Sequence, residues 1–138
     1  MIKTFTMKLD KIQPSQLFIS SAKLSEVMRS FSSQSIEPIP VKKLGNHVVF
    51  VDGHTRAFAA FLHGLSEVPV YWEVDELDWD AYEICVEWCL KDGIHTIADL
   101  KNRIVSHEEY EVLWLKRCER MQHDLEAKRR RAEKIHDQ

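Results

Sequence analysis

The sequence lacks the short motifs that mark several common classes of enzyme and binding protein. It contains neither the phosphate-binding loop G-x-x-x-x-G-K-[ST] nor the dinucleotide fingerprint G-x-G-x-x-G. It also lacks H-E-x-x-H and any C-x-x-C pair, which excludes the usual zinc sites. Its three cysteines, Cys85, Cys89 and Cys118, form an odd set. We interpret them as small buried hydrophobic residues rather than as a metal or redox site.

Long apolar segments and an excess of basic charge are also missing. No apolar run approaches the roughly 18 residues of a membrane-spanning helix, and the charged stretch from Met1 to Asp10 has no signal-peptide core. We therefore expect a cytoplasmic protein that does not enter a membrane. The net charge of −3 gives no global field for nucleic acid, so we do not expect nucleic acid as a partner.

The chain of 138 residues, 44% apolar and 30% charged, suits one small globular core with an appendage. Periodicity divides it into a small α/β unit, residues 1–74, and a helical extension, residues 75–138. In the first unit we expect strand His47–Val51, a helix opened by Gly53, and strand Val68–Val74. A compact crossover would join these two strands, so we predict that they are parallel.

The remaining elements of the first unit have weaker signals. We expect an extended segment at Leu9–Ile12, a helix over about residues 22–31, an edge strand at Ile36–Lys42 that contains Pro38 and Pro40, and a turn at Gly45-Asn46. The fold class is therefore α+β (α/β), with a small mixed sheet of about four strands, packed helices and a helical C-terminal extension.

The second unit is predicted to be a helical extension that begins with a linker or helix entry at Asp75–Asp80. Gly93 ends a first helix, and a short helix spans residues 96–103. Ser106-His107-Glu108-Glu109 is a capping box that opens the longest helix. We interpret its basic segment Lys128–Arg131 as a solvated helix end. The apolar stripe of this helix is Tyr110, Leu113, Trp114, Cys118, Met121 and Leu125.

The most informative stretch is Val48–Phe58, where a β-branched apolar run meets a glycine and then an alanine-rich helix. The N-terminus of a helix has unpaired N–H groups and partial positive charge, and Gly53 lets a ligand approach the backbone. The stretch therefore predicts a phosphate-binding turn made by Gly53, His54, Thr55 and Arg56.

Three side chains of this turn carry the chemical hypotheses. Asp52 is either the helix cap or a ligand for Mg²⁺ and an acid–base group, and one carboxylate could serve both roles. His54 at a helix N-terminus should be a neutral imidazole that can accept a proton or contact phosphate. Arg56 is poorly placed for helix stability, and a bound anion would explain its position.

Residues 7–74 also resemble the ParB/sulfiredoxin superfamily. The resemblance rests on four segments in order: Leu9–Pro14, Ile36–Val41, Asp52-Gly53-His54-Thr55-Arg56-Ala57, and Gly64–Val70. Members include CTP-binding partition proteins, ATP-using sulfiredoxins and ParB-like free serine kinases. The resemblance implies that the turn holds the phosphates of a nucleotide.

Departures from the pattern separate these branches. Sulfiredoxins have a catalytic cysteine directly after the turn glycine, where this chain has His54, and partition proteins have Gly-Glu-Arg-Arg. The turn is most similar to the Asp-Gly-His-His-Arg of the free serine kinases, with Thr55 in place of the second histidine. Those kinases also use a glutamate soon after the first strand, where this chain has Ser15 and Gln16. Glu26 and Glu37 are the candidate substitutes.

These observations predict a ParB-like nucleotide-binding protein that uses ATP, ADP or CTP with Mg²⁺. If it is an enzyme, it is a transferase or nucleotide hydrolase, with phosphoryl transfer to a small hydroxyl compound and with Asp52 and His54 as catalytic residues. The alternative is a non-catalytic adaptor or DNA-associated protein that acts through its C-terminal helices. In that case the long helix binds a protein partner or forms a homodimer.

Overall fold

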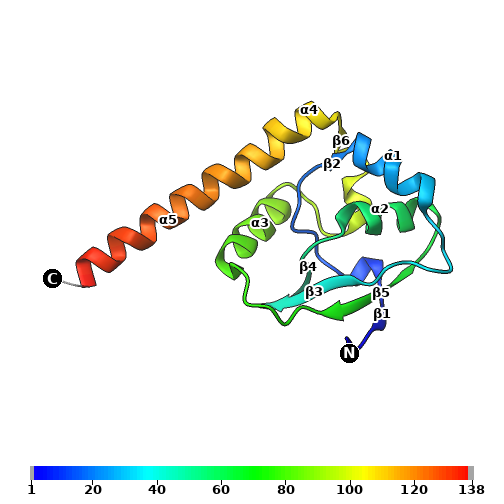
Figure 1. Ribbon diagram of the computed structural model, residues 1–138, viewed down its shortest axis with the longest axis horizontal. Helices are drawn as coiled ribbons and strands as arrows, with labels where there is room; N and C mark the ends of the chain where they lie inside the picture. The colour runs from blue at the N-terminus through cyan, green and yellow to red at the C-terminus, as the bar shows by residue number, and fades with distance from the viewer. Residues whose placement is uncertain (1, 137–138) are drawn as a thin grey trace.

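The computed structural model describes residues 2–136 and confirms a mixed α+β fold with a long C-terminal helix (Figure 1). Figure 1 shows α1, α2 and α3 on one side of the sheet, and α5 extends away from the body.

The strands are β1 (Phe5–Lys8), β2 (Ile19–Ser20), β3 (Ile39–Leu44), β4 (His47–Phe50), β5 (Glu67–Trp72) and β6 (Ile104–Val105). The helices are α1 (Ser21–Ser30), α2 (His54–Leu62), α3 (Trp79–Lys91), α4 (His107–Tyr110) and α5 (Lys116–His136). There are also 3₁₀ turns at Leu9–Lys11 and Ile97–Leu100 and a π-helical turn at Glu111–Leu115.

The main sheet has the strand order β1-β5-β3-β4. β3 runs antiparallel to β4 and parallel to β5, so β4 and β5 run in opposite directions and are not neighbours. The prediction that these two strands are parallel was therefore wrong. The reason is that β3 and β4 form a hairpin through the Gly45 turn, which places β4 at the sheet edge, and the chain returns through α2 to the far side of β3.

β3 lies inside the sheet, so the prediction of an edge strand there was also wrong. Val41 pairs with Phe50 of β4, which puts Pro40 opposite Val51, one residue beyond the end of that strand. The Val51 N–H donates to the Pro40 carbonyl at 3.0 Å. In a strand, the N–H and the C=O of one residue point towards the same neighbouring strand. An N–H at position 40 would therefore face Val51, beyond the last residue of β4, so the missing donor leaves no hydrogen bond of the β3–β4 pair unmade.

The first strand begins earlier than the expected segment at Leu9–Ile12. β1 ends at Lys8, and Leu9 starts a 3₁₀ turn. The alternation of half-buried and exposed side chains that is typical of a strand lies in Phe5–Lys8, before the expected segment. The chain then lies along β4: the Gln13 N–H donates to the Val48 carbonyl at 2.7 Å, and the Phe50 N–H donates to the Gln13 carbonyl at 3.0 Å. This pairing brings the segment after Gln13 next to the start of α2.

Helix boundaries follow the sequence signals closely. Ser20 caps α1 by accepting a hydrogen bond from the Lys23 N–H, and the Ser106–Glu109 capping box opens the long helix as predicted. Gly93, with φ +77°, follows α3. The predicted stripe of the long helix is wrong at Leu113, which is 40% exposed while Trp114 is buried, because the π-helical turn changes the rotation per residue.

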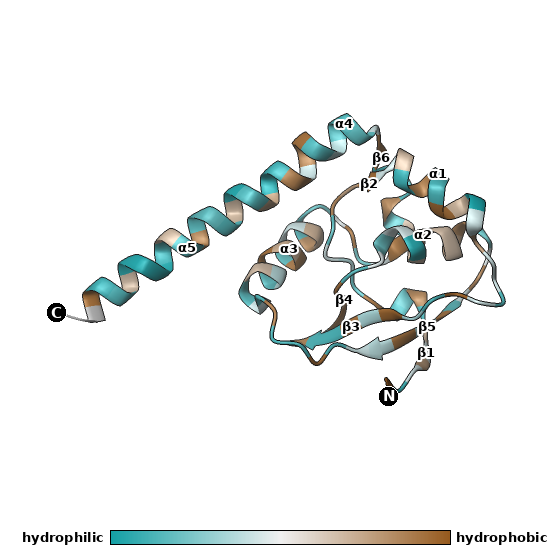
Figure 2. Ribbon diagram, viewed as in Figure 1, coloured by the Kyte–Doolittle hydropathy of each residue, from teal (hydrophilic) through white to brown (hydrophobic). Residues whose placement is uncertain are grey.

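One hydrophobic core contains residues from both sides of residue 74. Phe50 and Phe58 of the α/β part share it with Ile94, Leu100 and Trp114. β2 also pairs with β6 in parallel, which ties the start of α1 to the segment before α4. α5 is mostly hydrophilic in Figure 2. Within residues 2–136, no helix combines the length and the apolar character needed to cross a bilayer.

Gly53 is the N-cap of α2 and has φ +77°. A Cβ added there would lie 3.2 Å from Cγ2 of Ile39 and 3.4 Å from Nη1 of Arg56. Gly93 has the same φ but open space around it, so it provides a matched control.

We expect Gly53→Ala to lower the free energy of unfolding by more than Gly93→Ala. A left-handed conformation costs an L-residue about 1–2 kcal/mol, and only the alanine at position 53 adds a close contact with a buried side chain. Urea unfolding of both variants measures the difference. Equal losses would contradict tight packing of Ile39 against the turn.

Candidate functional site

The candidate phosphate-binding turn lies between β4 and α2, and the predicted strand and helix are present on its two sides. Gly53, between them, has the left-handed φ of +77°. Asp52 was predicted to be either the helix cap or a ligand and acid–base group. It is not the helix cap, because Gly53 is the N-cap of α2. The exposed Asp52 carboxylate instead accepts a hydrogen bond from the Gly53 N–H at 2.8 Å, which holds the turn. Thr55 lies half-buried in the first turn of the helix.

His54 is the first residue of α2 and points into the protein. Its Nε2 accepts a hydrogen bond from the backbone N–H of Ser15 at 2.9 Å, so the neutral ring carries its proton on Nδ1. Burial lowers the pKa of His54 to about 4, although the nearby Asp52 carboxylate raises it in part. The imidazole is therefore neutral near pH 7, but Ser15 already occupies Nε2.

Arg56 lies over the start of α2 and contacts the segment before β3. Its Nη1 donates hydrogen bonds to the carbonyl oxygens of Glu37 at 3.3 Å and Pro38 at 3.1 Å. Its Nη2 lies 3.6 Å from the exposed carboxylate of Glu37. A cation in the first turn of a helix opposes the helix dipole, and in this structure Glu37 and the two carbonyls provide the compensating negative charge.

Glu37 is therefore the acidic residue that the fold brings to the turn. The sequence offered Glu26 and Glu37 as alternatives without distinguishing them, and the ion pair with Arg56 distinguishes Glu37. No local signal could have done so, because the pairing depends on how the loop after α1 returns to the sheet.

A cavity of about 190 Å³ lies on the inner side of the turn. Ser15, Val51 and His54 line one side, and Tyr82, Cys85, Trp114, Cys118 and Gln122, from α3 and the long helix, are among the residues that line the other. The Tyr82 hydroxyl donates to the Val51 carbonyl at 3.2 Å, and the Ser15 hydroxyl donates to the Phe50 carbonyl at 2.6 Å. No local sequence pattern indicates this cavity, because its walls come from segments that are far apart in the chain.

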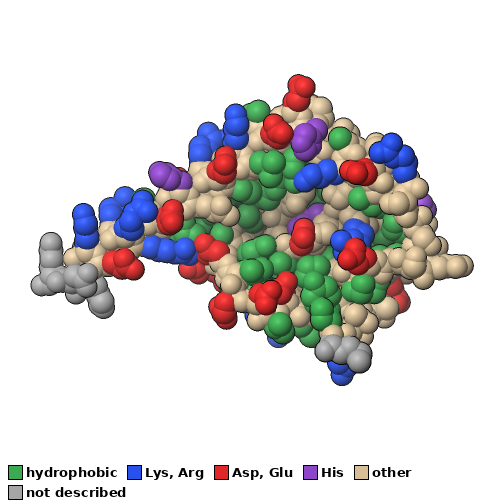
Figure 3. All heavy atoms as spheres, viewed as in Figure 1, with side chains coloured by type: hydrophobic (Ala, Val, Ile, Leu, Met, Phe, Trp, Pro, Cys, Tyr) green, Lys and Arg blue, Asp and Glu red, His purple; other side chains and the backbone are tan. Residues whose placement is uncertain are grey.

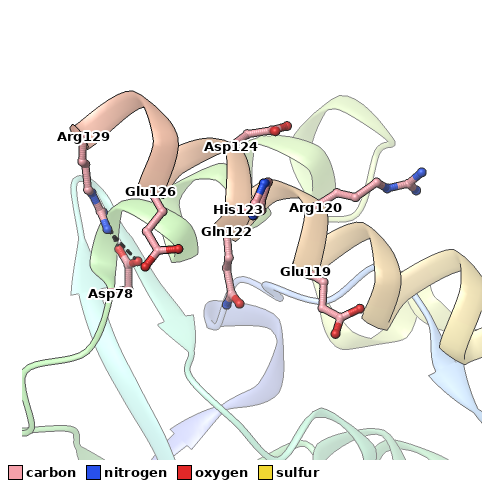
Figure 4. A pocket seen from close by; sticks show the side chains of 8 residues that line it. All are labelled: Asp78, Glu119, Arg120, Gln122, His123, Asp124, Glu126 and Arg129. Carbon is pink, nitrogen blue, oxygen red and sulfur yellow. Dashed lines mark hydrogen bonds and ion pairs between the residues drawn. The ribbon is translucent and has the colours of Figure 1, made fainter. Parts of the chain in front are cut away.

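A larger, open hollow of about 770 Å³ adjoins this cavity along α5, and Gln122 lines both (Figure 4). At its far end Arg129 pairs with Asp78 at 2.8 Å and with Asp80 at 3.2 Å, and the hydrogen bond from Arg129 lowers the pKa of Asp78. The space-filling view shows the body hollowed beside the long helix (Figure 3). Arg129, within the predicted solvated helix end, is thus anchored to the start of α3.

The chain by itself offers no complete metal site in residues 2–136, where no group of three or more His, Cys, Asp and Glu could hold an ion. Mg²⁺ usually takes one or two carboxylates together with waters and phosphate oxygens. Asp52, a single exposed carboxylate at the turn, therefore fits Mg²⁺ only together with the phosphates of a ligand.

No protein-family model matches the chain, and no curated protein matches its sequence. Among solved structures, protein Atu1540 from Agrobacterium tumefaciens is similar, with 15% identity and a TM-score of 0.51, over 71% of this chain and 61% of that chain. The C-terminally truncated chromosome-partitioning protein ParB from Caulobacter crescentus, complexed with CTP-gamma-S, matches with 21% identity and a TM-score of 0.46, over 64% of this chain and 53% of that chain. This chain thus spans less than two thirds of either, and the likeness to Atu1540 concerns the fold alone.

The buried His54 makes stability depend on pH. Its pKa is about 4 in the folded protein and 6.5 when unfolded, so its contribution is complete above pH 6.5 and is lost as the pH falls towards 4. The shift corresponds to about 3 kcal/mol. We expect His54→Gln, whose amide oxygen can accept the Ser15 N–H, to weaken this pH dependence.

Urea unfolding at pH 7 and pH 4 measures the effect, with His123→Gln on the exposed face of α5 as the control. The control should keep the pH dependence of the wild type. An unchanged dependence in His54→Gln would show that His54 is not held neutral by burial.

Proposed function

We propose that this chain binds a nucleotide through its phosphates, which rest on the turn from Gly53 to Arg56. The observation that carries the proposal is the start of α2, where a left-handed glycine and an arginine lie together beside the helix N-terminus. The resemblance of residues 7–74 to the ParB/sulfiredoxin superfamily supports a nucleotide rather than another anion.

The geometry suits a phosphate group for two reasons. The first N–H groups of a helix have no intrahelical partner and carry about half a positive charge, which attracts an anion. The Arg56 guanidinium lies within reach of the same place, because its Nη1 is 3.4 Å from the position of a Cβ on Gly53. Arginine binds phosphate with a planar pair of donors, so the two features reinforce each other.

Glu37 occupies part of this anion site in the free protein. Its carboxylate pairs with Arg56 at 3.6 Å, and it is 80% exposed, so it can move away at little cost. A nucleotide phosphate would replace Glu37 at the guanidinium. Released from this pair, the Glu37 carboxylate would remain near the phosphates, where it could accept a proton as a general base.

The finer proposal is phosphoryl transfer to a small hydroxyl compound, a reaction that depends mainly on positioning and charge. Asp52 would take part in binding Mg²⁺ with the phosphates, and Glu37 would accept the proton of the hydroxyl. His54 was predicted to be catalytic, but the Ser15 N–H occupies its Nε2. In this proposal His54 acts as a positioning residue that holds the start of α2.

The second candidate function, a protein adaptor, rests on a different surface. A groove of about 430 Å³ between α3 and α5 has an apolar floor that includes Ile84, Trp88 and Leu125. Val112 and Leu115, in the π-helical turn, are 55% and 41% exposed. A groove with an apolar floor, rather than singly exposed apolar residues, is the feature typical of surfaces that bind proteins.

We expect ATP or CTP with Mg²⁺ to raise the melting temperature of the wild type, and Arg56→Ala to weaken nucleotide binding at least tenfold. A hydrogen bond to a charged group contributes about 1.5–3 kcal/mol, which corresponds to a loss of this size. Thermal shift and calorimetric titration with ATP, ADP and CTP, each with and without Mg²⁺, measure both effects.

Arg103→Ala is the matched control, because Arg103 is similarly half-buried and also pairs with one carboxylate, that of Asp92. This variant should bind nucleotide like the wild type. If no nucleotide shifts a well-folded wild type, the proposed function fails and the adaptor becomes the better candidate.

Glu37→Gln separates binding from chemistry. Removing the carboxylate that competes for Arg56 should tighten nucleotide binding severalfold, and it should abolish phosphoryl transfer if Glu37 accepts the proton. Titration and a phosphate-transfer assay on the same preparation give the two readouts. Weaker binding by this variant would contradict competition between Glu37 and the phosphates.

A further inference from the structure

The cavity behind the turn brings together two cysteines that lie on different helices. Cys85 belongs to α3 and Cys118 to α5, both are free thiols, and both line the cavity. Cys85 is buried and Cys118 is half-buried. The sequence favoured inert cysteines because no C-x-x-C motif is present, but the tertiary structure forms the pair across two helices.

Packing between α3 and the long helix holds this pair in place. Trp88, about one turn after Cys85, packs edge to face against Trp114, about one turn before Cys118, with ring centroids 6.1 Å apart. The helices therefore run antiparallel here, with the two cysteines opposite each other. Arg117 lies over the Trp88 ring at 4.1 Å and adds a second contact across the same junction.

The two sulfurs are chemically unequal. The interaction between the two thiols lowers the pKa of Cys118 and raises the pKa of Cys85, and the charge of Arg117 also lowers the pKa of Cys118. A thiolate is the form of cysteine that reacts as a nucleophile. Cys118, the more accessible of the two, is therefore the attacking sulfur, and Cys85 is its resolving partner.

We propose that Cys85 and Cys118 form a peroxide-sensitive dithiol, which closes to a disulfide that links α3 to α5. The Cys118 thiolate attacks one oxygen of hydrogen peroxide, the O–O bond breaks, and hydroxide leaves to give the sulfenic acid. The Cys85 sulfur then attacks this sulfur, so that an S–S bond forms and the S–O bond breaks. The proton of Cys85 leaves with the second oxygen as water. Two thiols and one peroxide thus give one disulfide and two waters.

Cys89 provides an internal control for this chemistry. It lies one turn from Cys85 on α3, but it is fully buried, and its thiol donates to the Gln16 carbonyl at 3.6 Å. Burial raises the pKa of Cys89 to about 12, which keeps it protonated. It should therefore take no part in the reaction.

The test treats the reduced, folded chain with a small excess of hydrogen peroxide, blocks the remaining thiols with N-ethylmaleimide, and maps peptides by mass spectrometry. The wild type should fall from three thiols to one and yield a peptide pair linked through Cys85 and Cys118. Dithiothreitol should restore the thiols. Cys89→Ser should form the same disulfide, while Cys118→Ser should form none. In Cys85→Ser, dimedone should trap the sulfenic acid on Cys118.

The proposal is overturned if the wild type forms no intramolecular disulfide, if the bridge includes Cys89, or if the product is a disulfide between two chains. Equal reaction of all three cysteines would also overturn it. If Cys85→Ser does not fold, comparison of Cys118→Ser with Cys89→Ser still tests the proposal. Cys118 is less buried than Cys85, so its replacement should disturb the fold less.

Discussion

The hydrogen bond from the Ser15 N–H to Nε2 of His54 is the contact on which the arrangement of the turn depends. It is 2.9 Å long and buried, so its loss would leave a polar group unpaired in the interior. Ser15 also donates its hydroxyl to the carbonyl of Phe50, the last residue of β4. The two bonds together fix the segment after Gln13, the end of the strand and the start of the helix as one unit.

Burial of His54 divides the turn into an outer and an inner side. On the outer side lie the Asp52 carboxylate and the Arg56–Glu37 ion pair, beside the N-terminus of α2. The inner side carries the imidazole and the cavity that it shares with α3 and the long helix. The two proposals use different sides: phosphates would meet the outer groups, whereas the Cys85–Cys118 chemistry belongs to the inner cavity.

The long helix forms part of this inner side. Trp114 is buried in the common core and packs against Trp88, and Arg129 pairs with Asp78 at the start of α3. The helix thereby supplies one wall of the cavity behind the turn. Any movement of α5 relative to α3 would change that wall, and a covalent link between the two helices would hold it.

The amino-acid sequence by itself determined the local features: the α+β class, the glycine at the junction of strand and helix, the capping box at Ser106, and the cluster Asp52–Arg56 on one turn. Each depends on the conformational preferences of residues within a few positions of one another. Only the tertiary structure decided the strand order, the central place of β3, and three partners: Ser15 for His54, Glu37 for Arg56, and Cys118 for Cys85. These features depend on which distant segments can bury the most apolar surface together while their polar groups stay paired. That choice involves the whole chain, so no local sequence pattern predicts it.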